Sequence, residues 1–273
     1  MRTVYIGTAS FAANLLQVLA GVGAAPQLVI TRPDRLAGRG RKLTAPPVAV
    51  TARELGISVS QPPEINDAAT RRLISEVEPD LLLVCAYGAM IEEPLLSDYE
   101  ILNVHPSLLP RWRGAAPIER AIIAGDKETG VSIMRLTEGL DSGPVCATRS
   151  TPIADDDDFG SVAARLEQIG GGLLADVLEQ PRVFTEQDES NASYAEKITS
   201  SDRILDPAVS AEERERIVRA LSPHIGARAM LDDGTMLGVR SATLSDGELI
   251  YERVVPSGSR EMSWQEFQRG HSA

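Results

Sequence analysis

The sequence has only two cysteines among its 273 residues, and no cluster of cysteine, histidine and acidic side chains stands at a metal-ligand spacing. Cys85 lies in the apolar run LLLVCAY, which is typical of a buried strand, so we expect a small core thiol. Four consecutive aspartates, Asp155 to Asp158, precede a long helical pattern, and carboxylates are favoured at a helix N-terminus. We therefore predict a solvated helix start there and no metal site.

Charged side chains are absent from residues 3–31, which raises the question of a membrane span or a signal peptide. Glycines and Pro26 interrupt this stretch, and polar side chains lie at its centre. The pattern changes from VYI to the helical FAANLLQVLAGV and back to QLVI, as in a strand, a helix and a strand of one core. We expect a cytoplasmic protein with no membrane partner, and we expect it to be a monomer.

The sequence also lacks the two common nucleotide-binding signatures, G-x-G-x-x-G and G-x-x-x-x-G-K-[ST]. The segment GTAS, residues 7–10, follows the first apolar run but matches neither of them. We predict an ordinary turn from strand to helix here, with Thr8 or Ser10 as the N-cap.

Short apolar runs alternate with helical patterns over the first half of the chain. The runs expected to be strands are residues 4–6, 27–30, 57–59, 80–86 and 101–104. The helical patterns cover residues 11–22, 46–56, 66–77 and 114–125. This alternation predicts an α/β fold with a doubly wound, mostly parallel sheet. Ligands of such sheets bind beyond the carboxyl ends of the strands.

Asn103 and His105 stand at such an end, two residues apart. Side chains alternate along a strand, so both fall on one face. Asp141 follows in the glycine-containing turn EGLDSG. An amide and an imidazolium can stabilise an oxyanion while a carboxylate orients the ring, which suits acyl transfer. Taken alone, such a pair is more often an asparagine that caps a turn and a histidine in a polar niche of the core.

The wider segment favours the catalytic interpretation. It resembles the methionyl-tRNA formyltransferases in the order and spacing of three stretches, NVHPSLLPRWRGAAPIERAI, AGDKETGVSIMRL and EGLDSG. That family uses 10-formyltetrahydrofolate as formyl donor. The resemblance implies that Asn103, His105 and Asp141 are catalytic. It also implies folate contacts by the SLLP element and the AYG turn, namely Ser107, Leu108, Leu109, Pro110, Ala86, Tyr87 and Gly88. The leucines fit core packing equally well.

A basic loop points to the acceptor of the formyl group. The chain has a net charge of −12, yet residues 1–60 carry seven basic and two acidic side chains. TRPDRLAGRGRKL resembles the family's TQPDRPAGRGKKL, a loop that meets the acceptor end of tRNA. The resemblance implies that Arg39, Arg41 and Lys42 bind initiator methionyl-tRNA. An isolated basic loop is more often a solvated surface, and a local basic patch can still neutralise phosphates.

The C-terminal region departs from the family pattern. We expect a catalytic domain over 1–187, a linker over 188–206 and a reduced β-rich, tRNA-binding-type domain over 207–273. Its three β-type runs are too few for the five-stranded oligonucleotide-binding barrel that the resemblance implies. The function expected is formylation of initiator methionyl-tRNA for translation initiation. The alternative is a folate-dependent N-formyltransferase that acts on a nucleotide-linked amino sugar.

Overall fold

The computed structural model describes residues 1–37 and 40–271, and the chain forms two compact units. The first unit comprises Met1–Arg113, Gly130–Ser150 and Ala164–Ser193. The second comprises Gly114–Thr129, Thr151–Ala163 and Tyr194–Ala273. Segments from the middle of the sequence therefore belong to the second unit together with the C-terminal region.

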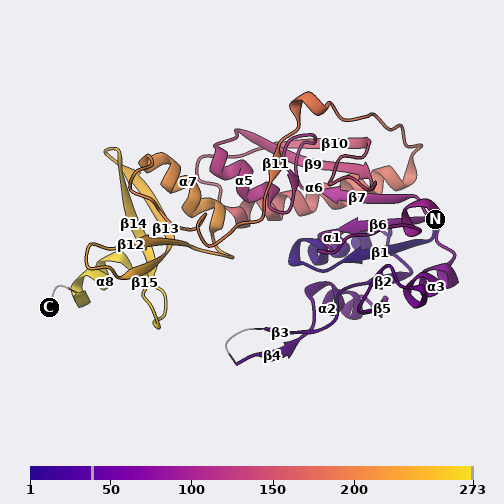
Figure 1. The fold of residues 1–273 in the computed structure, drawn as a ribbon, viewed down its shortest axis with the longest axis horizontal. Coiled ribbons are helices and arrows are strands. Elements are labelled where there is room, and N and C mark those ends of the chain that lie inside the picture. Colours follow the sequence, from indigo (N-terminus) through magenta and orange to yellow (C-terminus); the bar gives the residue numbers. More distant parts are fainter. Residues whose placement is uncertain (38–39, 272–273) are drawn as a thin grey trace. The chain divides into compact units, whose positions relative to one another are not determined.

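A seven-stranded sheet forms the centre of the first half of the chain, in the order β10-β9-β7-β6-β1-β2-β5 (Figure 1). Its strands are β1 (Thr3–Gly7), β2 (Leu28–Ile30), β5 (Ser58–Ser60), β6 (Leu81–Cys85), β7 (Ile101–His105), β9 (Glu128–Arg135) and β10 (Val145–Pro152). The pairs β1/β2, β1/β6, β2/β5 and β6/β7 are parallel, whereas β9 runs antiparallel to β7. Every residue of β1, β6 and β7 is buried, as expected for strands covered on both faces. The predicted doubly wound, mostly parallel sheet is confirmed.

The sheet changes its winding direction between β1 and β6, because the chain first adds β2 and β5 on one side and then returns to the other. At this switch point the amides of Thr8 and Ala9 donate to the carbonyl of Ala86. The Thr8 hydroxyl donates to the carbonyl of Tyr87. The predicted capping by Thr8 or Ser10 is wrong: Ala9 is the N-cap residue of α1 and makes no side-chain cap, because Thr8 binds the neighbouring turn instead.

Helices connect the strands, and all except the four-residue helix at Leu95–Asp98 lie where the sequence predicts them. They are α1 (Ser10–Gly21), α2 (Pro47–Glu54), α3 (Ala68–Val77), α4 (Leu95–Asp98), α5 (Pro117–Ala124) and α6 (Phe159–Glu179). At the start of α6, the Asp158 carboxylate accepts from the amide of Ser161 and its neighbour Asp157 is buried. The described part of the chain holds no cluster of three or more possible metal ligands, and the four aspartates directly precede α6. None of the described helices is both long and apolar enough to cross a membrane.

The basic segment forms a short antiparallel hairpin of β3 (Arg35–Ala37) and β4 (Lys42–Thr44). Gln61 holds its base, because its amide nitrogen donates to the carbonyl of Arg32 and to the carboxylate of Asp34. The sequence had predicted a basic loop here, without the strand pairing.

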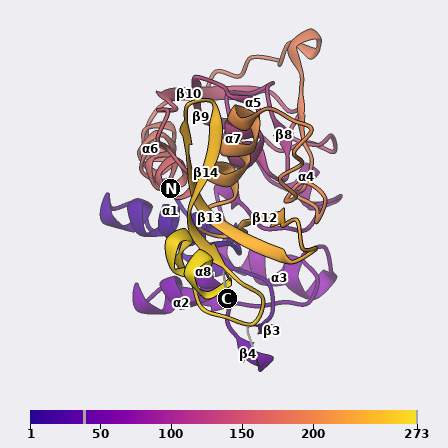
Figure 2. The same ribbon diagram turned by 90° about the vertical axis from the view of Figure 1, so that its left-hand side faces the viewer.

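The second unit contains an antiparallel sheet of four strands, in the order β12-β13-β14-β15. Its elements are β12 (Ala227–Met230), β13 (Met236–Ser245), β14 (Glu248–Val255), β15 (Met262–Ser263), α7 (Ala211–Leu221) and α8 (Trp264–His271). α7 buries Ile217, Val218 and Leu221 against this sheet. α8 lies against it through Phe267, which packs on Leu237 and Val254 (Figure 2).

The expected linker, residues 188–206, contains ordered elements. A 3₁₀ turn, η1 (Glu189–Asn191), precedes β11 (Tyr194–Ala195), which pairs with β8 (Arg113–Gly114). The segment is therefore paired with another part of the chain near its centre.

Candidate active site

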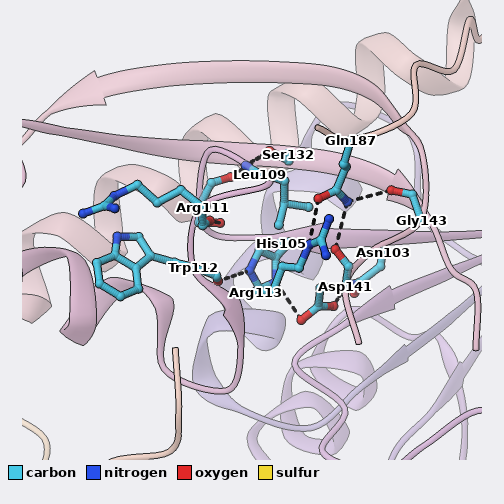
Figure 3. Close-up of polar contacts among 11 residues, drawn as sticks. Asn103, His105, Leu109, Arg111, Trp112, Arg113, Ser132, Asp141, Gly143 and Gln187 are labelled. Atoms are coloured by element: carbon cyan, nitrogen blue, oxygen red, sulfur yellow. Dashed lines mark hydrogen bonds and ion pairs between the residues drawn. The ribbon is translucent and has the colours of Figure 1, made fainter. Parts of the chain in front are cut away.

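The carboxylate of Asp141 lies between Asn103 and His105 (Figure 3). Asn103 Nδ2 donates to Asp141 Oδ1 at 3.2 Å, and His105 Nδ1 lies 3.6 Å from Asp141 Oδ2. Asn103 and His105 are 8% and 4% exposed, so the amide and the ring are held with little solvent around them. The structure thus brings together the three residues that the sequence predicts to be catalytic.

The turn that carries Asp141 is unusually constrained. Asp141 has φ +46°, a left-handed conformation that costs a non-glycine residue about 1–2 kcal/mol. Gly143 follows where a Cβ atom would lie only 2.0 Å from the carbonyl oxygen of Arg135. Close packing against β9 therefore determines where the carboxylate of Asp141 points.

The second ring nitrogen of His105 is also engaged. Nε2 lies 2.8 Å from the carbonyl oxygen of Trp112, which can only accept, so Nε2 carries a proton. Nδ1 then faces the carboxylate of Asp141. Both ring nitrogens face acceptors of the protein, and this geometry suits an imidazolium that supplies positive charge beside Asn103.

The predicted folate-contacting turns follow two adjacent strands. Ala86 and Gly88 are exposed and have φ +41° and +77°, whereas Tyr87 between them is 3% exposed. Burial raises the pKa of the Tyr87 phenol. The turn after β6 therefore presents backbone and small side chains, while its aromatic ring belongs to the core.

Hydrogen bonds of two serine hydroxyl groups hold the SLLP element, which follows β7. Ser107 is fully buried, and its hydroxyl donates to the carbonyl of Arg111. Ser132 Oγ accepts from the amide of Leu109 and donates to the carbonyl of Ser107. Leu108, Leu109 and Pro110 are only partly buried, so part of their apolar surface remains accessible beside the site.

Comparison with known proteins identifies the family of the chain. The family model "Formyl transferase" matches residues 1–178. The chain belongs to the formyl transferase family. It is 39% identical to a methionyl-tRNA formyltransferase of Halorhodospira halophila, over 98% of this chain and 96% of that protein. It is 40% identical to the protein of the same name in Methylococcus capsulatus, over 100% and 97% of the two chains. That alignment extends over 301 positions, more than the 273 residues here, so the relative has residues without a counterpart in this chain.

Solved structures of the family share the fold. The methionyl-tRNA formyltransferase from Clostridium thermocellum has a TM-score of 0.67 at 14% identity, covering 94% of this chain and 99% of that one. A sugar N-formyltransferase from a Shewanella species has a TM-score of 0.65 at 20% identity, covering 90% and 99%. The two scores are nearly equal, so overall fold similarity does not distinguish the acceptors that these two names imply.

Two of the three predicted tRNA-binding residues, Arg41 and Lys42, lie on the basic hairpin. Arg41 has φ +48° and Lys42 begins β4, and both side chains are exposed. Arg39 lies outside the described residues. No described contact links Arg41 or Lys42 to the three residues of the site.

Sequence reasoning did not single out Arg113, Gln187 and Glu189, which hydrogen bonds link to one another and to the backbone of Asp141. Figure 3 shows Arg113 and Gln187 beside the three residues of the site. Arg113 is 1% exposed and is the largest of the fully buried side chains. Its position in RWRGAAP gave little indication of burial, because a charged residue next to a site is usually solvated. Its partners come more than seventy residues later, at a distance that no local pattern shows.

Proposed function

We propose that this chain transfers the formyl group of 10-formyltetrahydrofolate to the α-amine of initiator methionyl-tRNA, giving N-formylmethionyl-tRNA for translation initiation. The observation that carries the proposal is the identity of about 40% to methionyl-tRNA formyltransferases over almost the whole length of both chains. The arrangement of Asn103, His105 and Asp141 supports it, because it presents donors suited to an acyl-transfer oxyanion.

The residues beside the site fit a folate. The turns after β6 and β7 present exposed backbone at Ala86 and Gly88 and partly accessible apolar surface at Leu108, Leu109 and Pro110. Such a surface suits a flat heterocycle that needs backbone hydrogen bonds and apolar contact. Bound there, 10-formyltetrahydrofolate supplies the formyl carbon and N10 as the leaving nitrogen.

Asn103 acts on the formyl oxygen in this proposal. One N–H of its carboxamide binds Asp141, and the other is available to the oxygen as negative charge develops on it. His105 adds positive charge next to the same position, and Asp141 keeps amide and ring in place. The methionyl amine forms the new C–N bond and loses a proton, the bond from carbon to N10 breaks, and N10 gains a proton. Asp141, the carboxylate beside Asn103 and His105, can pass that proton through water.

The acceptor is held by the basic hairpin. We assign Arg41 and Lys42, together with Arg39, to contacts with the acceptor stem, because exposed cations at the tip of a hairpin can reach phosphates. We assign residues 207–273 to a reduced tRNA-binding-type domain after a catalytic domain over 1–187 and a linking segment over 188–206. We place the enzyme in the cytoplasm as a monomer.

A parallel assay of two acceptors tests the function. Purified protein and 10-formyltetrahydrofolate are offered charged initiator tRNA in one reaction and nucleotide-linked amino sugars in another, with Asp141→Asn as a control of strongly reduced activity. Formylation of methionyl-tRNA alone supports the proposal. Formylation of the amino sugar alone would replace it by the alternative, which the short C-terminal sheet of four strands favours.

A further inference from the structure

Gln187 lies directly behind the turn that carries Asp141. Its Nε2 atom donates to the carbonyl oxygen of Asp141 at 2.8 Å and to that of Gly143 at 2.7 Å. An amide nitrogen has two hydrogens, and here both are used on one three-residue segment. The side chain therefore holds this turn at two points.

Arg113 fixes which way the Gln187 carboxamide faces. Arg113 Nε donates to Gln187 Oε1 at 3.0 Å, which leaves the NH₂ group pointing at the turn. The guanidinium is itself held by Glu189, with Nη1 and Nη2 donating to the two carboxylate oxygens at 3.0 and 2.7 Å. A paired fork of this kind has little rotational freedom. The orientation of the amide is thus set by a buried cation and not by solvent.

The chain of contacts ends at strained backbone. Asp141 has φ +46°, in the left-handed region, which a non-glycine residue does not favour by itself. Contacts from the surrounding structure therefore keep the backbone in this conformation. Without the two donors of Gln187, the turn can relax toward a common conformation and its carboxylate turns away from Asn103 and His105. Gln187 holds the backbone of the turn, and this role requires no contact between Gln187 and substrate.

The short segment of Trp112 and Arg113 also supports His105. Trp112, the residue before Arg113, offers its carbonyl oxygen to His105 Nε2. Ser193 secures both residues, since its hydroxyl accepts from the amide of Trp112 and its carbonyl accepts from the amide of Arg113. One segment therefore positions the ring directly and the carboxylate through Gln187.

We infer that Gln187, oriented by Arg113, is a positioning residue that aligns Asp141 for formyl transfer, an inference that rests on the proposed function. It acts through the backbone of Asp141 and touches neither substrate. Its removal therefore lowers kcat while the KM values of both substrates stay nearly constant.

Gln187→Glu isolates this role. The variant keeps an acceptor for Arg113 and removes the two donors to the turn, and Gln180→Glu makes the same chemical change at an exposed position after α6. We expect kcat to fall about 10- to 100-fold in Gln187→Glu, because small misplacements of catalytic groups cost that much. We expect wild-type kcat in Gln180→Glu. Equal kcat in wild type and Gln187→Glu would overturn the inference.

A double substitution separates positioning from loss of stability. If Gln187 acts through Asp141, then Gln187→Glu combined with Asp141→Asn is no slower than Asp141→Asn alone, within about twofold. A multiplicative loss would show that Gln187 acts independently of Asp141. Should Gln187→Glu fail to fold, Glu189→Gln loosens the same chain at an exposed residue, and an unchanged kcat there counts against the inference.

Nuclear magnetic resonance of ¹⁵N-histidine-labelled protein tests the geometry without turnover. The chain has only three histidines, so the ring signals of His105 are readily assigned. We expect them to shift in Gln187→Glu and not in Gln180→Glu, and unchanged signals would overturn the inference. Wild-type protein that is inactive on methionyl-tRNA would instead refute the proposed function, with the spectra still reporting on Gln187.

Discussion

His105 Nε2 lies 2.8 Å from the carbonyl oxygen of Trp112, a residue whose φ of +64° is rare for any side chain larger than glycine. The carbonyl faces the ring because the backbone adopts this conformation. The hydrogen bond that keeps a proton on Nε2 of His105 therefore depends on a backbone angle seven residues away in sequence.

Substitution of Trp112 by glycine and by valine separates backbone from side chain. Both variants lose the contact of Arg111 with the indole ring, but valine is strained at positive φ whereas glycine is not. We expect the free energy of unfolding of Trp112→Val to be about 1 kcal/mol lower than that of Trp112→Gly. We also expect Trp112→Val to have the lower kcat. Urea unfolding and initial rates measure the difference, and equal stability of the two variants would contradict it.

Asn103→Ala removes the donor that we assign to the formyl oxygen. One oxyanion donor contributes about 3 kcal/mol to transition-state stabilisation, so kcat should fall roughly 100-fold. The folate turns keep their structure, and the dissociation constant for folate should remain within about twofold. Single-turnover kinetics and a folate titration measure both quantities, and parallel loss of rate and folate affinity would argue against an oxyanion role.

The strand pattern predicted the sheet well because burial acts locally on each run. Residues 81–86 are apolar, residues 101–104 are apolar except Asn103, and β6 and β7 are buried at every position. The grouping of Asn103 with His105 followed from the period of a strand, while Asp141 was placed by family resemblance. Local pattern and resemblance together led to the three residues that meet in the structure.

The support behind these residues could not be predicted in the same way. Arg113 is buried because Gln187 and Glu189 satisfy it, and those partners lie where the predicted catalytic domain ends and the predicted linker begins. The capping prediction at Thr8 failed for a similar reason, since its hydroxyl found the carbonyl of Tyr87 on a distant turn. Polar partners far apart in sequence leave no periodic signal.

Gly143→Ala should disturb both stability and rate. The added Cβ atom would lie 2.0 Å from the carbonyl oxygen of Arg135, so the turn that carries Asp141 must move. We expect a loss of about 1–3 kcal/mol in the free energy of unfolding and a kcat at least about tenfold lower. Gly172→Ala is the control, because open space surrounds this position within α6 and alanine there should stabilise by about 0.5–1 kcal/mol.

Replacing both Arg41 and Lys42 by glutamine should weaken only the binding of tRNA. Each phosphate contact that is lost reduces the slope of log affinity against log salt by nearly one, so the variant should be weaker at low salt and less salt-dependent. Arg72→Gln, an exposed change on α3, is the control. Binding of charged tRNA measured between low and physiological salt distinguishes them, and an unchanged slope would exclude these residues from the contact.

Asp202 has a role in stability that depends on pH. Burial raises the pKa of its carboxyl group, but hydrogen bonds from Thr199 and Arg120 outweigh this effect and lower the pKa to about 2. The amide of Thr199 donates to the carboxylate at 2.7 Å and Arg120 Nη1 at 3.0 Å. These contacts tie residues 199–202 to α5 within the second unit.

Asp202→Asn should therefore destabilise the protein only where the wild-type carboxylate is charged. A group whose pKa is lower in the folded state stabilises it above the unfolded pKa of 3.8, and this contribution disappears as pH falls toward about 2. We expect a deficit of about 2 kcal/mol in the free energy of unfolding at pH 6, shrinking steadily below pH 4. Glu252→Gln, an exposed change on β14, should show no such trend. Urea unfolding at a series of pH values measures both curves, and a deficit for Asp202→Asn that stays constant down to pH 2.5 would mean that lost packing, not lost charge, weakens the variant.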